Sequence, residues 1–272
     1  MSDAPAGARP DPELRGILLT VAYDGRGFAG WARQPTQRTV AGELLGALRA
    51  IDPAIGEVRG ASRTDAGVHA RGQRVAFDTQ SDVPMKGWVL GVTRHLPAEI
   101  AVRRAASVRP GLVPRFDSAG KLYRYTLLAD PVRDPMLDGR VWRLPELCAP
   151  EAQARAAAEA PLAEGTHDFS AFRSAADERR ATVRSLRRVR IVADAADARL
   201  IHVEVEGDAF LHNMVRILVG TIVDVARGRL EAGAIGRALA SGDRRDAGIT
   251  APPDGLCLER VDLRDEGTGA WP

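Results

Sequence analysis

The chain contains little cysteine and few aromatic residues. Its 272 residues include only two cysteines, Cys148 and Cys257. They are too far apart to match the short spacings of a metal site, and two cysteines do not build a disulfide framework. We therefore expect a protein of a reducing compartment, the cytoplasm.

Long apolar runs are missing as well. The most apolar stretch, residues 214–226, is interrupted by Arg216 and Asp224, so the sequence predicts no transmembrane helix. The first ten residues are small and polar and lack the apolar segment of a signal peptide. We expect residues 1–15 to form a disordered tail.

Neither sign of charge dominates, since 38 basic and 36 acidic residues give a formal net charge of +2. Lysine is almost absent, so 36 of the 38 basic residues are arginines. A GC-rich genome explains most of such a count, and solvated faces are the ordinary reading of arginine clusters. Arginine also suits phosphate and base recognition, so two clusters favour a phosphate-binding surface. They are Arg59, Arg63, Arg71 and Arg74, and Arg179, Arg180, Arg184, Arg187, Arg188 and Arg190.

Hydrophobic periodicity predicts alternating strands and helices in two similar halves. The expected halves are residues 16–110 and residues 111–272. The sequence therefore predicts an α+β protein in which mixed, largely antiparallel sheets meet at a central active-site cleft. The expected strands are 17–23, 75–77, 100–102, 122–127, 183–192, 200–205 and 256–261, and the expected helices start at Thr39 and cover 88–95, 150–160 and 210–226.

One Gly-rich segment, residues 24–30, formally matches the dinucleotide-binding pattern G-x-G-x-x-G. That pattern requires a helix at its third glycine, and Pro35 follows Gly30 too closely for such a helix. The segment is therefore predicted to be a loop. The helix is expected to begin after Thr39, a good N-cap residue.

The string Ser62-Arg63-Thr64-Asp65-Ala66-Gly67-Val68-His69-Ala70 concentrates reactive side chains beside an apolar strand. A guanidinium near a carboxylate keeps it ionised, which suits a nucleophile or a base. Gly67 permits a sharp turn. An Asp-Ala-Gly surface turn is the simpler interpretation of any one of these residues alone.

Two further segments carry polar groups on apolar elements. Tyr123 and Tyr125 share one face of a predicted strand, and an aromatic ring there can stack on a base or belong to the core. Asp208 is a plausible N-cap of the helix that carries Arg216. The Arg216 guanidinium lies beside apolar positions and needs a carboxylate partner, for which Asp65 is the natural candidate. An edge arginine reaching solvent is the alternative.

Taken together, these segments resemble the tRNA pseudouridine synthase A family from about Leu18 to Val261. The matching motifs occur in the family's order. They are Tyr-Asp-Gly…Phe-Ala-Gly-Trp, Thr39-Val40, the Asp65 string, Arg115-Phe116, Tyr-Arg-Tyr, Gly165-Thr166-His167-Asp168-Phe169, Phe-Leu…Met-Val-Arg, and Gly-Leu-Cys-Leu.

The resemblance implies a pseudouridine synthase fold and isomerisation of uridine to pseudouridine at positions 38, 39 and 40 of the tRNA anticodon stem-loop. Asp65 would be the catalytic aspartate, acting at ribose C1′, at uracil C6 or in glycal formation. Tyr123 would stack on the uracil, Arg216 would pair with Asp65, and Arg63 would lie near the displaced base or a phosphate. Leu258, or Leu256 beside it, would close the base pocket.

The resemblance also implies a homodimer that shares one tRNA and needs neither cofactor nor metal. His69 is expected near RNA and His167 in a structural role. Two alternatives stay open on the residues alone. One is a non-catalytic RNA-binding module, and the other is a metal-dependent hydrolase that uses Asp65, His69, His167 and Asp168, although their spacing matches no familiar metal site.

Overall fold

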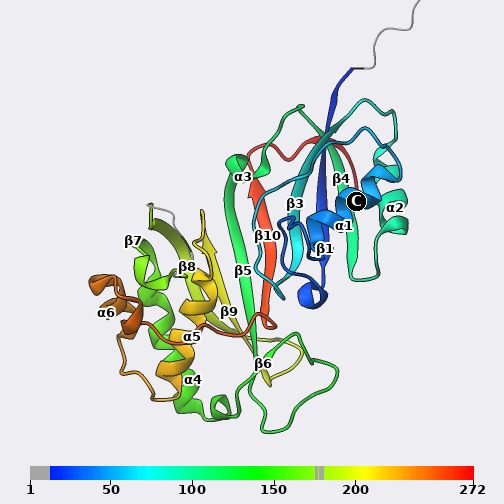
Figure 1. The fold of residues 1–272 in the computed structure, drawn as a ribbon. Coiled ribbons are helices and arrows are strands. Elements are labelled where there is room, and N and C mark those ends of the chain that lie inside the picture. Colours follow the sequence, from blue (N-terminus) through cyan, green and yellow to red (C-terminus); the bar gives the residue numbers. More distant parts are fainter. Residues whose placement is uncertain (1–12, 175–176, 178–180) are drawn as a thin grey trace, which may run out of the picture.

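The computed structural model describes residues 13–174, 177 and 181–272, and within them eleven strands form one mixed sheet (Figure 1). The strand order is β11-β4-β1-β3-β10-β5-β9-β8-β7, with β2 beside β3 and β6 beside β5. The strands are β1 (Arg15–Tyr23), β2 (Arg59–Gly60), β3 (His69–Thr79), β4 (Ile100–Val108), β5 (Ser118–Leu128), β6 (Trp142–Arg143), β7 (Gly165–Asp168), β8 (Val183–Ala193), β9 (Leu200–Gly207), β10 (Leu256–Leu263) and β11 (Thr268–Trp271).

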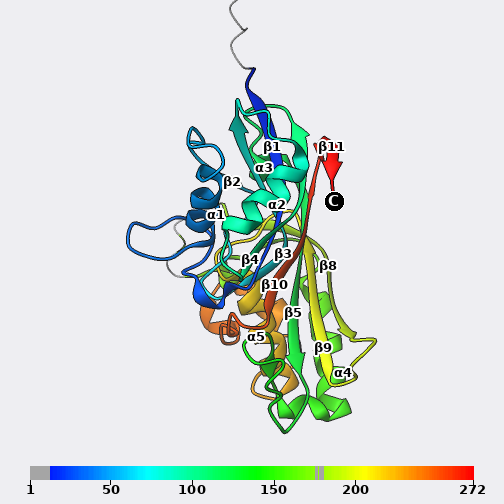
Figure 2. The same cartoon turned by 90° about the vertical axis from the view of Figure 1, so that its right-hand side faces the viewer.

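Helices gather at the two ends of this sheet. In Figures 1 and 2, α1 and α2 lie beside the β1–β4 end, and α4, α5 and α6 lie beside the β8–β9 end. The helices are α1 (Val40–Arg49), α2 (Met85–His95), α3 (Pro114–Asp117), α4 (Pro150–Glu159), α5 (Met214–Ala226) and α6 (Ala234–Ser241). In the described part of the chain, none of them is long and apolar enough to cross a membrane.

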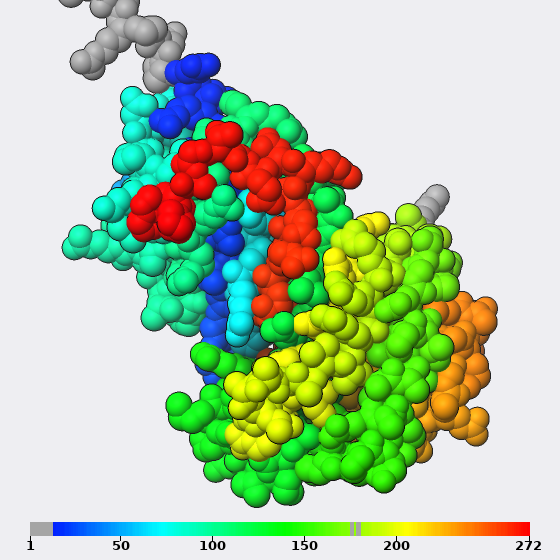
Figure 3. Space-filling model, turned by 180° about the vertical axis from the view of Figure 1, so that it is seen from behind, coloured from blue at the N-terminus to red at the C-terminus, as the bar shows by residue number. Residues whose placement is uncertain are grey.

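The predicted fold class is confirmed, because the ladders are antiparallel except for β10–β3 and β5–β6. The two predicted halves share one continuous sheet. Strand β10 lies between β3 and β5, so that Leu258 is opposite Ala70 on one side and Tyr123 on the other. Figure 3 shows β1, β3 and β10 side by side from behind, in blue, cyan and red. This register holds the start of β3 level with the middle of β5, on the other side of β10.

The Gly-rich segment is a loop, as predicted, and its glycines serve another purpose than binding a nucleotide. A short 3₁₀ turn (Gly25–Gly27) follows β1, and the next helix begins only at Val40 with the Thr39 side chain as its cap. A Cβ at Gly25 would lie 2.1 Å from the Val68 carbonyl oxygen. Glycine is therefore needed here so that this loop can pack against the Asp65 segment.

The predicted start of the helix that carries Arg216 is wrong by four residues. Helix α5 begins at Met214, and Asn213 before it adopts a left-handed conformation with φ of 61°. Asp208 does not cap the helix, because its carboxylate instead accepts a 2.6 Å hydrogen bond from Arg187. Asparagine tolerates the left-handed region better than most residues do. The turn frees residues 208–213 to line a cavity.

Candidate active site

The Asp65 loop connects β2 to β3 and is fastened to the loop that follows β1. The Trp31 N–H donates to the Thr64 carbonyl at 3.1 Å, and the Gly67 N–H donates to the Phe28 carbonyl at 3.3 Å. The Tyr23 and Thr64 hydroxyls lie 2.8 Å apart. Gly67 has φ of 79°, as its predicted turn requires. Asp65 is thereby held on a loop with little freedom to move.

A cavity of about 770 Å³ opens in front of Asp65. Its walls come from the Asp65 loop, from β5, from the turn that precedes α5 and from β10. Tyr123, Arg216 and Leu256 line it together with Asp65. Segments that are far apart in sequence therefore meet at one carboxylate, which is the usual construction of a binding or catalytic site.

Asp65 lies between two basic side chains. The distance from its Oδ1 to His212 Nε2 is 3.4 Å, and the distance from its Oδ2 to an Arg216 guanidinium nitrogen is 3.8 Å. Burial raises the pKa of Asp65, while His212 and Arg216 act against this rise. The expected pairing with Arg216 is present. Burial and His212, which the sequence does not bring to Asp65, also act on the ionisation of this carboxylate.

Arg216 is aimed by two other groups. Its Nε donates to the Ala251 carbonyl at 2.7 Å, and one terminal nitrogen donates to Asn213 Oδ1 at 2.9 Å. These bonds fix the plane of the guanidinium and leave its remaining donors facing the cavity. The left-handed turn at Asn213 thus contributes directly to the position of the cation.

Tyr123 lies at the base of the cavity and is nearly fully buried. Its hydroxyl is 2.8 Å from the Ser62 hydroxyl, and its ring packs edge-on against Phe210 at 5.1 Å between centroids. Burial raises the pKa of Tyr123 far above its usual value, so the phenol is neutral. Tyr125 shares the face, as predicted, but its hydroxyl bonds to the Pro252 carbonyl outside the cavity lining.

The other predicted substrate contacts are divided. Arg63 is exposed on the cavity wall and makes no hydrogen bond or ion pair within the described residues. Of the two leucines that the resemblance offered, Leu256 lines the cavity, whereas Leu258 is fully buried and absent from the lining. The structure therefore brings Asp65, Tyr123, Arg216 and Arg63 together, and it brings Leu256 to them in place of Leu258.

Two cavity residues were missed by sequence reasoning. In the sequence, His212 is only one residue of the segment before Arg216, and Lys121 stands out only as one of two lysines. The Lys121 ammonium is buried and donates to the Ala61 carbonyl at 2.9 Å. A signal for Lys121 existed, because it shares a strand face with Tyr123 by the period of two.

The two other histidines of interest serve the scaffold. His69 Nδ1 accepts from the Gly25 N–H at 3.1 Å, and its Nε2 lies 3.0 Å from the Asp254 carbonyl. His69 therefore links two loops, and its expected place near RNA stays a prediction. His167 bonds to the Glu164 carbonyl at 2.8 Å. Within residues 13–174, 177 and 181–272, no group of three or more His, Cys, Asp or Glu side chains could hold a metal ion.

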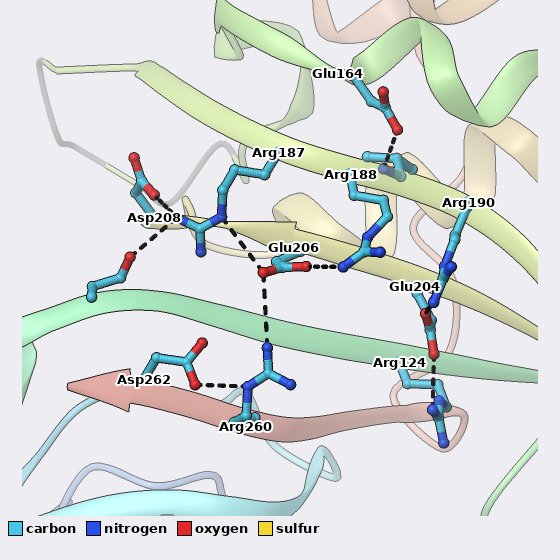
Figure 4. Close-up of polar contacts among 12 residues, drawn as sticks. Arg124, Glu164, Arg187, Arg188, Arg190, Glu204, Glu206, Asp208, Arg260 and Asp262 are labelled. Carbon is cyan, nitrogen blue, oxygen red and sulfur yellow. Dashed lines mark hydrogen bonds and ion pairs between the residues drawn. The ribbon is translucent and has the colours of Figure 1, made fainter. Parts of the chain in front are cut away.

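Three members of the second arginine cluster, Arg187, Arg188 and Arg190, are paired with carboxylates (Figure 4). Arg187 and Arg188 both contact Glu206, because a bulge in β8 turns these neighbours to the same face. Arg190 and Arg124 bind Glu204 from opposite sides. We call this set, with Arg260 and Asp262, the arginine–carboxylate ladder. It contradicts the predicted phosphate-binding stripe for Arg187, Arg188 and Arg190, while Arg179 and Arg180 lie outside the described residues.

The first arginine cluster is also largely paired. Arg59 binds Asp78 at 2.9 Å, and Arg74 binds Glu266. Arg71 is exposed and only 3.9 Å from Glu259. Arg63 remains as the member that faces the cavity without a partner in the described part of the chain.

A half-buried carboxylate between a histidine and an arginine, in one cavity with a buried tyrosine, is the arrangement of an enzyme active site. A family model described as tRNA pseudouridine synthase matches residues 160–263. Proteins named tRNA pseudouridine synthase A are similar over most of the chain. The one from Citrifermentans bemidjiense is 41% identical over 91% of this chain and 97% of its own length. The one from Myxococcus xanthus is 41% identical over 92% of each chain.

The chain belongs to the tRNA pseudouridine synthase A family. It is therefore an isomerase, and its mixed sheet with flanking helices is an α+β pseudouridine synthase fold. Among solved structures, a Cbf5-Nop10-Gar1 complex matches at 15% identity with a TM-score of 0.36. That match covers 97% of this chain and 58% of the other, and it is too distant to support an argument.

Proposed function

We propose that this protein isomerises uridine to pseudouridine at positions 38, 39 and 40 of the anticodon stem-loop of tRNA, with Asp65 as the catalytic aspartate. In this reaction the N1–C1′ bond breaks, the uracil turns, and C5 bonds to C1′. The C5 proton is lost and N1 gains one, so no oxidant or reductant is consumed. The observation that carries the proposal is Asp65 between His212 and Arg216 at the wall of a cavity of about 770 Å³.

Each neighbour has a separate task. Arg216 favours the ionised form of Asp65, which is the form that can act as nucleophile or base. Tyr123 provides an aromatic surface for the uracil, and Leu256 closes the pocket from β10. Arg63 is available to a phosphate or to the space that the flipped uridine leaves, because unstacking a base from a stem costs a few kcal/mol.

The direct test is an assay of pseudouridine in unmodified tRNA transcript with wild type and with Asp65→Asn. We expect product in the anticodon arm only with wild type, and comparable binding of tRNA by both proteins. Asp82→Asn is a matched control, since Asp82 is a fully exposed carboxylate paired with Arg15. Turnover by Asp65→Asn would refute the catalytic role, and binding without turnover by wild type would favour a non-catalytic RNA-binding module.

We further infer a cytoplasmic homodimer in which one tRNA contacts both subunits. A net charge of +2 supports local rather than global attraction of RNA. Sedimentation of the protein with and without tRNA measures the stoichiometry directly. A monomer at micromolar concentration in both conditions would contradict the inference.

A further inference from the structure

The cavity has a second end that the proposed reaction does not use. Besides Asp65, His212 and Arg216, the cavity is lined by Arg115, Phe116 and Lys121, and we take this second group, which comes from α3 and β5, as the second end. Lys121 and Tyr123 are two residues apart on one face of β5, which separates them by about 7 Å. The second end is therefore close enough to contact a nucleotide adjacent to the one at Asp65.

Lys121 is a buried cation without a counterion. It is 7% exposed, and within the described residues no carboxylate lies at ion-pair distance from it. One of its three donors is used by the Ala61 carbonyl, and besides burial the repulsion from another cation, Arg115, lowers the pKa of Lys121. Burial lowers the pKa of Lys121 to about 8. Buried charges in proteins are normally paired, so this arrangement favours binding of an anion from outside the chain.

Phe116 adds a flat apolar surface at the same end. It is 79% exposed although it belongs to a well-anchored turn. The turn is held because the buried Asp117 carboxylate accepts the Asp265 N–H at 2.8 Å, and the Asp117 carbonyl accepts the Arg264 N–H at 3.1 Å. An exposed aromatic ring on an anchored turn, in one cavity with two cations, is the combination that binds single-stranded nucleic acid.

We propose that this end is a subsite for a nucleotide next to the target uridine, where Lys121 and Arg115 bind its phosphate and Phe116 stacks on its base. The proposal rests on the proposed function, because it takes the target uridine to lie at Asp65. The phosphate supplies the missing counterion of Lys121. The subsite would anchor the strand on one side of the flipped nucleotide.

The test uses synthetic anticodon stem-loops in which single linkages near the target uridine carry a neutral methylphosphonate. Affinity is measured for wild type, Lys121→Met and Arg115→Gln. We expect one linkage whose neutralisation weakens binding by wild type roughly ten- to a hundredfold and by Lys121→Met far less. Arg188→Gln removes the same charge from the arginine–carboxylate ladder and should lose affinity at that linkage as wild type does.

A purely structural Lys121 gives a different result. The effect of its replacement on affinity would then add to that of every neutral linkage. Additivity at all linkages for both Lys121→Met and Arg115→Gln would overturn the phosphate contact. Arg115 is exposed, so its variant remains informative if Lys121→Met fails to fold.

Stacking is tested with an abasic nucleotide on either side of the target uridine. We expect Phe116→Ala to weaken binding, and we expect an abasic site on one side of the target uridine to weaken it as well. When this variant binds the abasic RNA, the loss of affinity should be no larger than either change causes alone. Independent losses would overturn the stacking. Failure of wild type to form pseudouridine while these couplings persist would refute the proposed function and leave an RNA-binding subsite.

Discussion

The cavity and the arginine–carboxylate ladder are both rich in arginine, yet they differ in what their cations contact. In the ladder, Glu204 and Glu206 each accept more than one guanidinium (Figure 4). In the cavity, Lys121 and Arg63 have no carboxylate partner within the described residues. Clustering of arginines in the sequence therefore does not identify a surface that binds anions. Cations without a carboxylate partner in the folded structure do identify one.

The largest effect is expected where a cavity cation lies beside the Asp65 carboxylate. Arg216→Gln should lower kcat roughly a hundredfold, because it removes a charge preorganised against Asp65. Activity needs ionised Asp65, so it falls as the pH falls through the raised pKa of that group. Without Arg216 this pKa rises further, and the acid limb of kcat/KM against pH should move to higher pH.

In that experiment, Arg216→Lys separates the effect of the positive charge from the effect of its orientation. Lysine keeps the positive charge but cannot make the paired bonds to Ala251 and Asn213. We expect an acid limb close to that of wild type with a reduced kcat. An unchanged pH profile for Arg216→Gln would show that Arg216 does not influence the pKa of Asp65.

Tyr123→Phe should have the next largest effect. The ring against Phe210 is kept, while the hydroxyl and its bond to Ser62 are lost. We expect a lower kcat with little change in binding, together with a loss of about 1 kcal/mol in unfolding free energy. Tyr125→Phe is the matched control, since its hydroxyl bonds outside the cavity lining. Equal turnover of both variants would reduce Tyr123 to a packing role.

Lys121→Met should make the protein more stable at pH 7. The pKa of Lys121 is lowered by burial from 10.5 to about 8, so the folded state pays for the charge below pH 8. This penalty disappears as the pH rises from 8 toward the unfolded value. Allowing for the lost bond to Ala61, we expect a gain of about 2 kcal/mol at pH 7 that shrinks by pH 10. Thermal unfolding at both pH values measures it, and a lower midpoint at pH 7 would show that Lys121 stabilises the fold.

The smallest effect is expected in the ladder. Arg188→Gln breaks an exposed pair with Glu206, and such pairs contribute less than about 1 kcal/mol. Affinity for tRNA should change less than twofold at moderate salt. A reduced dependence of binding on salt for this variant would show that the ladder contacts RNA and would erase the contrast with the cavity.

Local signals carried much of the fold. Thr39 before an amphipathic run located α1, and Pro35 excluded a nucleotide-binding helix at Gly30. The start of α5 was misplaced because Asn213 adopts a left-handed turn that no local pattern demands. In the site, the motif resemblance located Asp65, Tyr123 and Arg216. Whether Lys121 or Arg188 has a carboxylate partner depends on the side chains of neighbouring strands. Only tertiary packing decides which side chains these are.

The position of β10 also has a consequence for the order of synthesis. Residues 256–263 fill the gap between β3 and β5, so both strands lack their shared neighbour until that segment has been synthesised. Pairing so distant in sequence closes slowly. A nascent chain can form its early strands and helices, but the cavity gains its wall at Leu256 only after β10 has been made. The site therefore cannot be complete while the ribosome has not yet passed residues 256–263.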